Sequence, residues 1–103
     1  MTDERMTTEP TRGTLRPPAD IVAATIPGLR TELRSMMAAG ASEIVLDFSN
    51  VTMIDSAGIG LVVAAHNTLG RAGGKLAIVH AAPDVFELLA AMRIPQHMEV
   101  SGN

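Results

Sequence analysis

The sequence predicts an α/β fold built on a mixed, mostly parallel β-sheet, and two observations carry this prediction. Continuous runs of branched apolar residues at 43–48 and 75–79 have the length and composition of buried strands. The segment between them, 58–69, is long enough for a helix and consists mainly of small and apolar residues. A strand–helix–strand unit joins parallel strands through a right-handed crossover. This alternation along the chain predicts a sandwich of about four to five short strands with three to four helices.

One compact domain, residues 1–103, accounts for the whole chain. Of its 103 residues, 47% are hydrophobic, and a domain of this size buries roughly 60–70% of the surface of its unfolded chain. Residues 1–12 are expected either to be flexible or to form a short edge hairpin, in which 5–8 pairs with 13–16. No second domain is needed.

Three helices are predicted from apolar residues at helical spacing and from residues that favour helix ends. They cover 25–40, 58–69 and 83–92, and a last strand follows at 97–100. Thr25 and Pro83 are residue types that helices favour at their starts, and Gly70 is predicted to end the second helix in a left-handed conformation. The continuous apolar character of 43–48 suggests a strand that is covered on both faces of the sheet.

The composition argues against several classes of function. A formal net charge of −3 disfavours nucleic acid or an anionic membrane as the main partner, and a chain without cysteine has no disulfide and no thiolate metal site. The longest apolar run, 59–65, is far shorter than the ~20 residues of a membrane span. The first residues lack the apolar core of a signal peptide. We therefore expect a cytoplasmic protein without direct membrane insertion.

Ser56 is the one candidate nucleophile, because it lies in the connection between the predicted strand and the second helix. A nucleophile elbow needs glycine two residues before and two residues after the serine, and Ile54 occupies the first of these positions. The pair Gly58 and Gly60 lacks the third glycine and the lysine of nucleotide-binding loops. The three histidines, His66, His80 and His97, have no metal-ligating spacing. The sequence predicts no catalytic residue, no metal and no cofactor.

Two interpretations of Asp55 and Ser56 remain open on chemistry alone. In the first, one of these side chains caps the following helix, which stabilises it by about 1 kcal/mol. In the second, the surface serves a partner. The glycines at 58 and 60 would leave the first helical turn bare, and the apolar residues of this helix spread too widely for a single buried stripe.

The segment Asp55-Ser56-Ala57-Gly58-Ile59-Gly60-Leu61, preceded by 44–48 and Val51, resembles the signature of the STAS domain family, the anti-sigma factor antagonists. The resemblance extends from about residue 15 to 100 and implies a STAS-like sandwich. In that family a partner serine kinase of the GHKL type, which doubles as the anti-sigma factor, phosphorylates the serine after the aspartate. By this match Ser56 is the phosphoacceptor.

The resemblance also implies which residues contact the partner: Asp20, Asp55, Ser56, Ala57, Gly58, Ile59 and Gly60. Asp20 falls where the family has an acidic loop, although only the acid matches there. Ala57 stands where the family often has a second hydroxyl, which leaves Ser56 as the single acceptor of the motif.

The expected function is that of a non-catalytic module that binds a regulatory kinase and is switched off by phosphorylation of Ser56. The alternative is a constitutive STAS scaffold, an accessory subunit of a transporter, stress-signalling or chemotaxis-linked assembly without phospho-switching. The sequence also leaves open a weak homodimer formed through the N-terminal edge.

Overall fold

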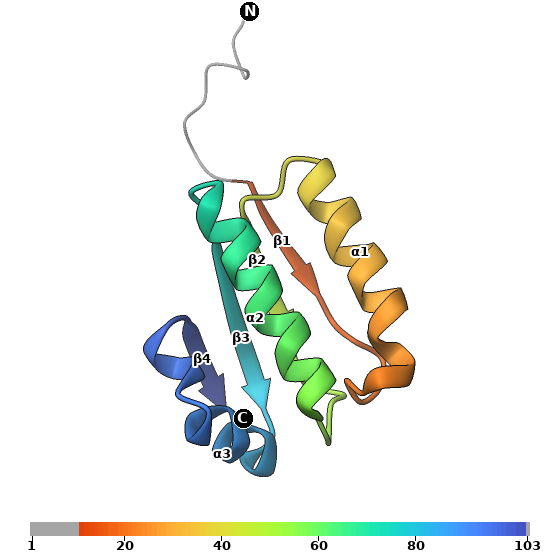
Figure 1. The fold of residues 1–103 in the computed structure, drawn as a ribbon, viewed down its shortest axis with the longest axis vertical. Helices are drawn as coiled ribbons and strands as arrows, with labels where there is room; N and C mark the ends of the chain where they lie inside the picture. Colours follow the sequence, from red (N-terminus) through yellow and green to blue (C-terminus); the bar gives the residue numbers. More distant parts are fainter. Residues whose placement is uncertain (1–10, 103) are drawn as a thin grey trace, which may run out of the picture.

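The computed structural model describes residues 11–102 and contains a single four-stranded sheet (Figure 1). Its strands are β1 (Arg12–Leu15), β2 (Glu43–Asp47), β3 (Lys75–Ala81) and β4 (Glu99–Gly102). They follow one another in the order of the sequence, and every pair of neighbours is parallel. The predicted α/β class is confirmed. β1 pairs parallel with β2, whereas the outer strand of the predicted hairpin, 5–8, lies outside the described residues.

The predicted helices are confirmed with small shifts at their ends. They are α1 (Ile26–Ala38), α2 (Ser56–Arg71) and α3 (Pro83–Ala91), and the short 3-10 turns are η2 (Ala23–Thr25) and η3 (Ile94–Gln96). The prediction that Gly70 caps the second helix in the left-handed conformation is wrong. Gly70 lies within α2, and the left-handed residue is Gly73, with φ of 82°.

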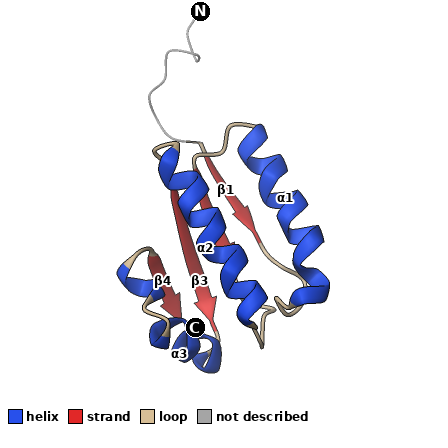
Figure 2. Ribbon diagram, in the orientation of Figure 1, coloured by secondary structure: helices blue, strands red, loops and turns tan. Residues whose placement is uncertain are grey.

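The connecting helices lie on one face of the sheet. Each new strand is added to the sheet next to the previous one and always in the same direction. Right-handed crossovers therefore place all the connecting helices on the same face. Figure 2 shows α2 in front of the strands, α1 to the side of β1, and α3 near β4. The core fills the space between the sheet and these helices, and its most buried apolar side chains are Ile21, Ile44, Phe48, Val51, Val62, Ile78, Val85 and Leu89.

The prediction that the central strand is covered on both faces is wrong for the described part of the chain. Ile44 and Leu46 of β2 are buried against the helices, whereas Glu43 and Val45 on the other side of the strand are only half-buried. The one-sided crossovers are the physical reason. Nowhere in residues 11–102 is a helix long and apolar enough to cross a membrane.

Candidate functional site

Two loops meet at the carboxyl ends of β1 and β2, and together they hold the start of α2. We call this pair, 16–22 and 48–55, the loop clasp. Ile21 and Ile54 form an isolated parallel bridge between the loops. The backbone N–H of Ile21 donates to the carbonyl of Met53 at 3.1 Å, and the N–H of Asp55 donates to the carbonyl of Ile21 at 3.2 Å. Ile21 is also buried in the core, so the clasp is anchored to the rest of the domain.

Asp20 fastens the first loop to the second. One carboxylate oxygen accepts from the backbone N–H and the hydroxyl of Thr52, both at 2.8 Å, and from the N–H of Met53 at 3.1 Å. These donors favour the ionised form. The backbone hydrogen bond from Thr52, followed by that from its hydroxyl, holds the pKa of Asp20 below its ordinary value. The predicted acid of this loop therefore has an internal structural role.

Replacing Asp20 with asparagine is expected to lower the free energy of unfolding at neutral pH, and the difference from the wild type should shrink in acid. Because the folded state lowers the pKa of Asp20, its carboxylate stabilises the fold above the unfolded-chain value of about 4. This contribution is lost as the pH falls through the folded-state pKa. Urea unfolding of both proteins at a series of pH values measures the difference. A difference that stays constant into acid would contradict the role assigned to the carboxylate charge.

Asp55 caps α2 and fastens the second loop to the first. Its backbone is extended, as at a helix N-cap, and Oδ1 accepts from the N–H of Gly58 at 2.8 Å. Oδ2 accepts from the N–H of Ala23 at 3.1 Å, in the turn that leads into α1. The helix-cap interpretation of Asp55 is thereby confirmed. Both predicted acids thus direct oxygens at backbone N–H groups across the clasp.

Ser56 is the first residue of α2 and is exposed. The structure shows no hydrogen bond from its hydroxyl to another described residue, because the N-cap position is taken by Asp55. The first turn of α2 carries no acidic side chain. A helix start is the positive end of the helix dipole and has unpaired N–H groups. Ser56 therefore presents a free hydroxyl at a position that tolerates an added anion.

The glycines of the motif have different surroundings. Gly60 and Ala57 are exposed, and a Cβ added at Gly60 would have no neighbour within 4 Å among residues 11–102. Gly58 is buried, and a Cβ there would lie 2.5 Å from the carbonyl oxygen of Ile21. Ile59 is buried as well. The expectation that both glycines leave the first turn accessible is therefore wrong for Gly58, which allows the loop clasp to approach the helix.

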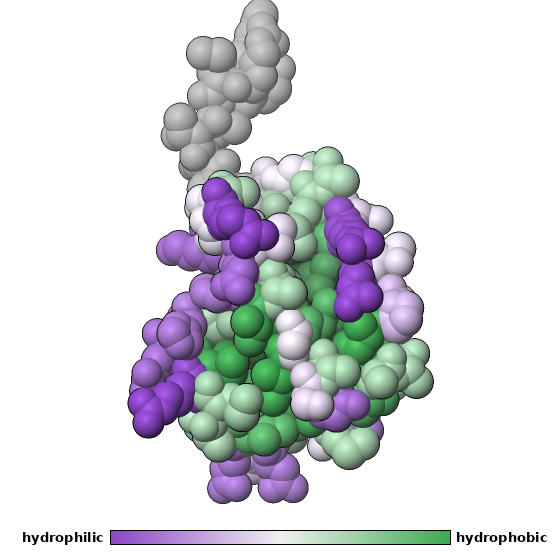
Figure 3. Space-filling view, viewed as in Figure 1, coloured by the Kyte–Doolittle hydropathy of each residue, from purple (hydrophilic) through white to green (hydrophobic). Residues whose placement is uncertain are grey.

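Exposed apolar side chains lie beside Ser56 and further along the helices. Met53, just before Ser56, is 54% exposed. Val63 on α2 is exposed too, as are Leu88 and Met92 on the α3 side. Figure 3 shows apolar surface over α2 and the neighbouring α3 on this side of the molecule. A free hydroxyl next to exposed apolar groups is an arrangement suited to a protein partner.

A second polar cluster lies at the same end of the sheet and was missed by sequence reasoning. The buried carboxylate of Asp47, at the end of β2, accepts from Arg16 Nε at 3.2 Å and from the N–H of Ser49 at 3.0 Å. It also bonds the hydroxyl of Ser49 and, at 3.1 Å, Nδ1 of His80. These contacts, first of all the Ser49 hydroxyl, hold the pKa of Asp47 far below its usual range. The sequence does contain an indication of this cluster, because polar residues stand at the ends of neighbouring predicted strands.

The Asp47 cluster does not have the geometry of a nucleophilic site. Ser49 and His80 both bond to Asp47, so the serine hydroxyl is paired with a carboxylate and not with the imidazole base that a triad requires. His80 reaches Asp47 from a left-handed backbone conformation with φ of 59°. Within residues 11–102 no group of three or more potential ligands is placed to hold a metal ion.

The fold and the site together define a small α/β domain with its helices on one face of the sheet. It exposes a serine at the start of a helix that the loop clasp holds in place. A model of the STAS domain family matches residues 5–102, so the chain belongs to the STAS domain family. The resemblance found in the central motif is thereby confirmed. No curated protein matches the sequence.

Solved structures of anti-sigma factor antagonists share the fold. A Thermotoga maritima protein assigned to this class superposes with a TM-score of 0.83 at 19% identity, over 89% of this chain and 80% of that one. SpoIIAA in its unphosphorylated form gives 0.76 at 16% identity, over 91% and 83% of the two chains. The Bacillus cell fate determinant SpoIIAA in its phosphorylated form gives 0.69 at 15% identity, over 91% and 86%.

Proposed function

We propose that this protein is a non-catalytic regulatory module that binds a partner through the surface around Ser56 and releases it when Ser56 is phosphorylated. The observation that carries the proposal is the exposed Ser56 hydroxyl, which lacks a hydrogen bond to any described residue although it lies beside a tightly bonded loop clasp. A serine needed only for capping would direct its oxygen at the helix N–H groups. Here Asp55 does so instead.

Phosphorylation of Ser56 would change the surface and leave the fold intact. A phosphate adds about −1.5 to −2 charges, and the first turn of α2 favours an anion through its dipole and free N–H groups. The carboxylates of Asp20 and Asp55 are already bonded across the clasp, so nothing in the clasp has to rearrange. SpoIIAA, which was solved in both phosphorylation states and is similar in fold to this chain in both, supports this view.

The proposed contact surface consists of the exposed residues Ser56, Ala57 and Gly60, extended by Met53 and Val63. The other residues predicted to contact the partner support this surface and do not belong to it. Asp20 and Asp55 hold the loops, and the buried Gly58 and Ile59 set the position of α2. Because family resemblance points to a serine kinase that doubles as an anti-sigma factor, we propose a GHKL-type kinase as the partner, with the domain acting as its protein substrate.

Capture of the partner from an extract of the native host tests this function. Wild-type protein and Ser35→Glu, which places the same charge on an exposed position of α1, are expected to capture the same kinase. Ser56→Glu is expected to capture little of it, because the new carboxylate lies at the contact. Capture of a transporter or receptor assembly by all three proteins alike would contradict the switch and favour the constitutive scaffold.

A further inference from the structure

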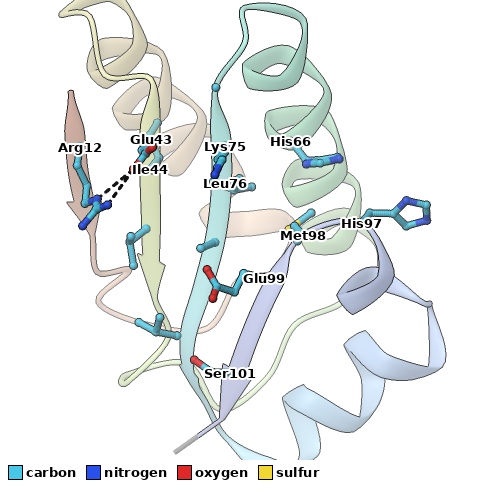
Figure 4. Close-up of a pocket in the computed structure, with 14 residues that line it drawn as sticks. Arg12, Glu43, Ile44, His66, Lys75, Leu76, His97, Met98, Glu99 and Ser101 are labelled. Atoms are coloured by element: carbon cyan, nitrogen blue, oxygen red, sulfur yellow. Dashed lines mark hydrogen bonds and ion pairs between the residues drawn. The ribbon is translucent and has the colours of Figure 1, made fainter. Parts of the chain in front are cut away.

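The face of the sheet opposite the helices is covered by no other part of residues 11–102. Figure 4 looks onto this face, with the helices behind the strands. It contains a hollow of about 660 Å³, which extends past β3 to His66 of α2 and to His97. We call this face of the sheet the open face. The side chains of the hollow that belong to it come from all four strands: Arg12, Glu43, Val45, Lys75, Ala77, Val79, Glu99 and Ser101.

The floor of the open face is apolar. Val45, Ala77 and Val79 lie at its centre and are only half-buried. Parallel sheets occur almost only with both faces covered, because their central strands are apolar on both sides. The partly exposed floor therefore indicates a surface that another body covers.

The charges of the open face are balanced. Arg12 and Lys75 oppose Glu43 and Glu99, and Arg12 Nη2 lies 3.0 Å from Glu43 Oε1. A nucleic acid, or a peptide whose charges are mostly of one sign, would require a face whose charges are mostly of the opposite sign. A face that carries both signs in equal number fits a surface with the same composition, which is a second copy of this chain.

The register of the strands makes this pattern self-complementary. Glu43 on β2 is the register partner of Lys75 on β3, and Val45 is that of Ala77. If two sheets stack face to face about a two-fold axis parallel to the strands and midway between β2 and β3, the axis exchanges these two strands. Each Glu43 then faces Lys75 of the other copy, and each Val45 faces Ala77 of the other copy.

The next register pair on this face, Asp47 and Val79, lies at the end of the two strands, where Asp47 is already bonded to Arg16 and His80. The two pairs nearer the start of the strands are opposite in charge and apolar, respectively.

We propose that the open face is a homodimer interface in which two sheets stack about this axis. A two-fold axis perpendicular to the strands would instead stack each strand on the equivalent strand of the other copy, and the two would run in opposite directions. That arrangement brings Lys75 towards Val79 of the other copy, because both residues lie on the same side of β3. Lys75 would then face an apolar side chain and no acid, so the charge pattern favours the first stacking. This surface is distinct from the helical face that contains Ser56, so the dimer leaves Ser56 accessible.

The dimer is expected to be weak. Four strands at the usual spacings give a face about 19 Å wide and about 16 Å long, which is smaller than the interfaces of stable dimers. An interface of this size is expected to form only at high protein concentration. The dimer should therefore dissociate on dilution.

Analytical ultracentrifugation of the full chain with exchanged charges tests the proposal. Glu43→Lys and Lys75→Glu each place like charges across the axis, and each is expected to weaken self-association by about tenfold or more. In an equimolar mixture of the two variants, position 43 of each faces a side chain of opposite charge at position 75 of the other, so the mixture should associate as the wild type does. The double variant should do the same. Arg34→Glu, on the exposed side of α1, is the matched control and should leave association unchanged.

Three results would overturn the proposal. The first is a wild type that stays monomeric at the highest concentration that remains clear, and the second is a mixture that restores no association. The third is a set of nuclear Overhauser contacts between residues 1–10 and the methyl groups of Val45 that persists on dilution, because the face would then be covered by the chain's own N-terminal segment. Circular dichroism spectra confirm that each variant is folded before it is compared.

Discussion

Replacing Gly58 with alanine is expected to lower the free energy of unfolding by about 3 kcal/mol. The added Cβ would lie 2.5 Å from the carbonyl oxygen of Ile21 and 2.6 Å from Cγ1 of Ile54. Both residues belong to the bridge that joins the two loops, and the Ile21 carbonyl accepts from the N–H of Asp55. The methyl group therefore forces the loop clasp apart. The gain from replacing glycine in a helix, about 1 kcal/mol, is too small to offset this.

Gly60→Ala is the matched control for this substitution. The same methyl group is added two residues further along α2, where it has no contact within 4 Å to another described part of the chain. Alanine should there raise the free energy of unfolding by about 0.5–1 kcal/mol, through its better helix propensity. Urea unfolding of the two variants and the wild type measures both effects. Equal effects of the two substitutions would show that the clasp does not depend on close approach at Gly58.

Phosphorylation of Ser56 is expected to weaken partner binding by two to three orders of magnitude, or about 3–4 kcal/mol. The partner would have to accommodate a bulky dianion at the centre of its contact, beside the carboxylate of Asp55. The thermal unfolding temperature of the domain should change little, because the phosphate lies at the favourable end of α2. The effect is thus on the interface and not on stability.

Calorimetric titration of the partner with the phosphorylated and the unphosphorylated protein measures this difference. Ser56→Ala should bind as the unphosphorylated protein does, and Ser56→Glu should lose less affinity than the phosphorylated protein, because a carboxylate carries less charge than a phosphate. Raising the salt concentration should narrow the gap between the two forms, since ions screen exposed charges. Equal affinity of both forms, under low salt, would contradict the proposed switch.

The fold was predictable because its central unit is local in the sequence. β2 and β3 are short apolar runs, and the helix between them has the required length. The exposure of one face was not predictable from the same runs. Val45 is apolar although its side of the sheet is open, so its residue type gives no indication of what covers it. Only the strand order of the folded chain shows which face the crossovers leave bare.

The position of Ser56 was predictable from the change of strand to helix, but the roles of its neighbours were not. Asp20 bonds Thr52, and Asp55 bonds Ala23, across 32 residues of chain in each case. Such contacts leave no local pattern in the sequence. The buried Gly58 looks the same as the exposed Gly60 until Ile21 is placed beside it. For this reason the motif indicated the site, while the loop clasp that holds it became visible only in three dimensions.

Phosphopeptide mapping of the protein purified from its native host, by mass spectrometry, tests the role of Ser56 most directly. We predict a population of molecules with a single phosphate, located on Ser56, and no phosphate on a Ser56→Ala variant expressed in its place. The unphosphorylated fraction alone should copurify with the partner. Phosphate on a different serine or threonine with Ser56 unmodified, or a partner that copurifies equally with both fractions, would contradict the assignment of Ser56 as the regulated contact.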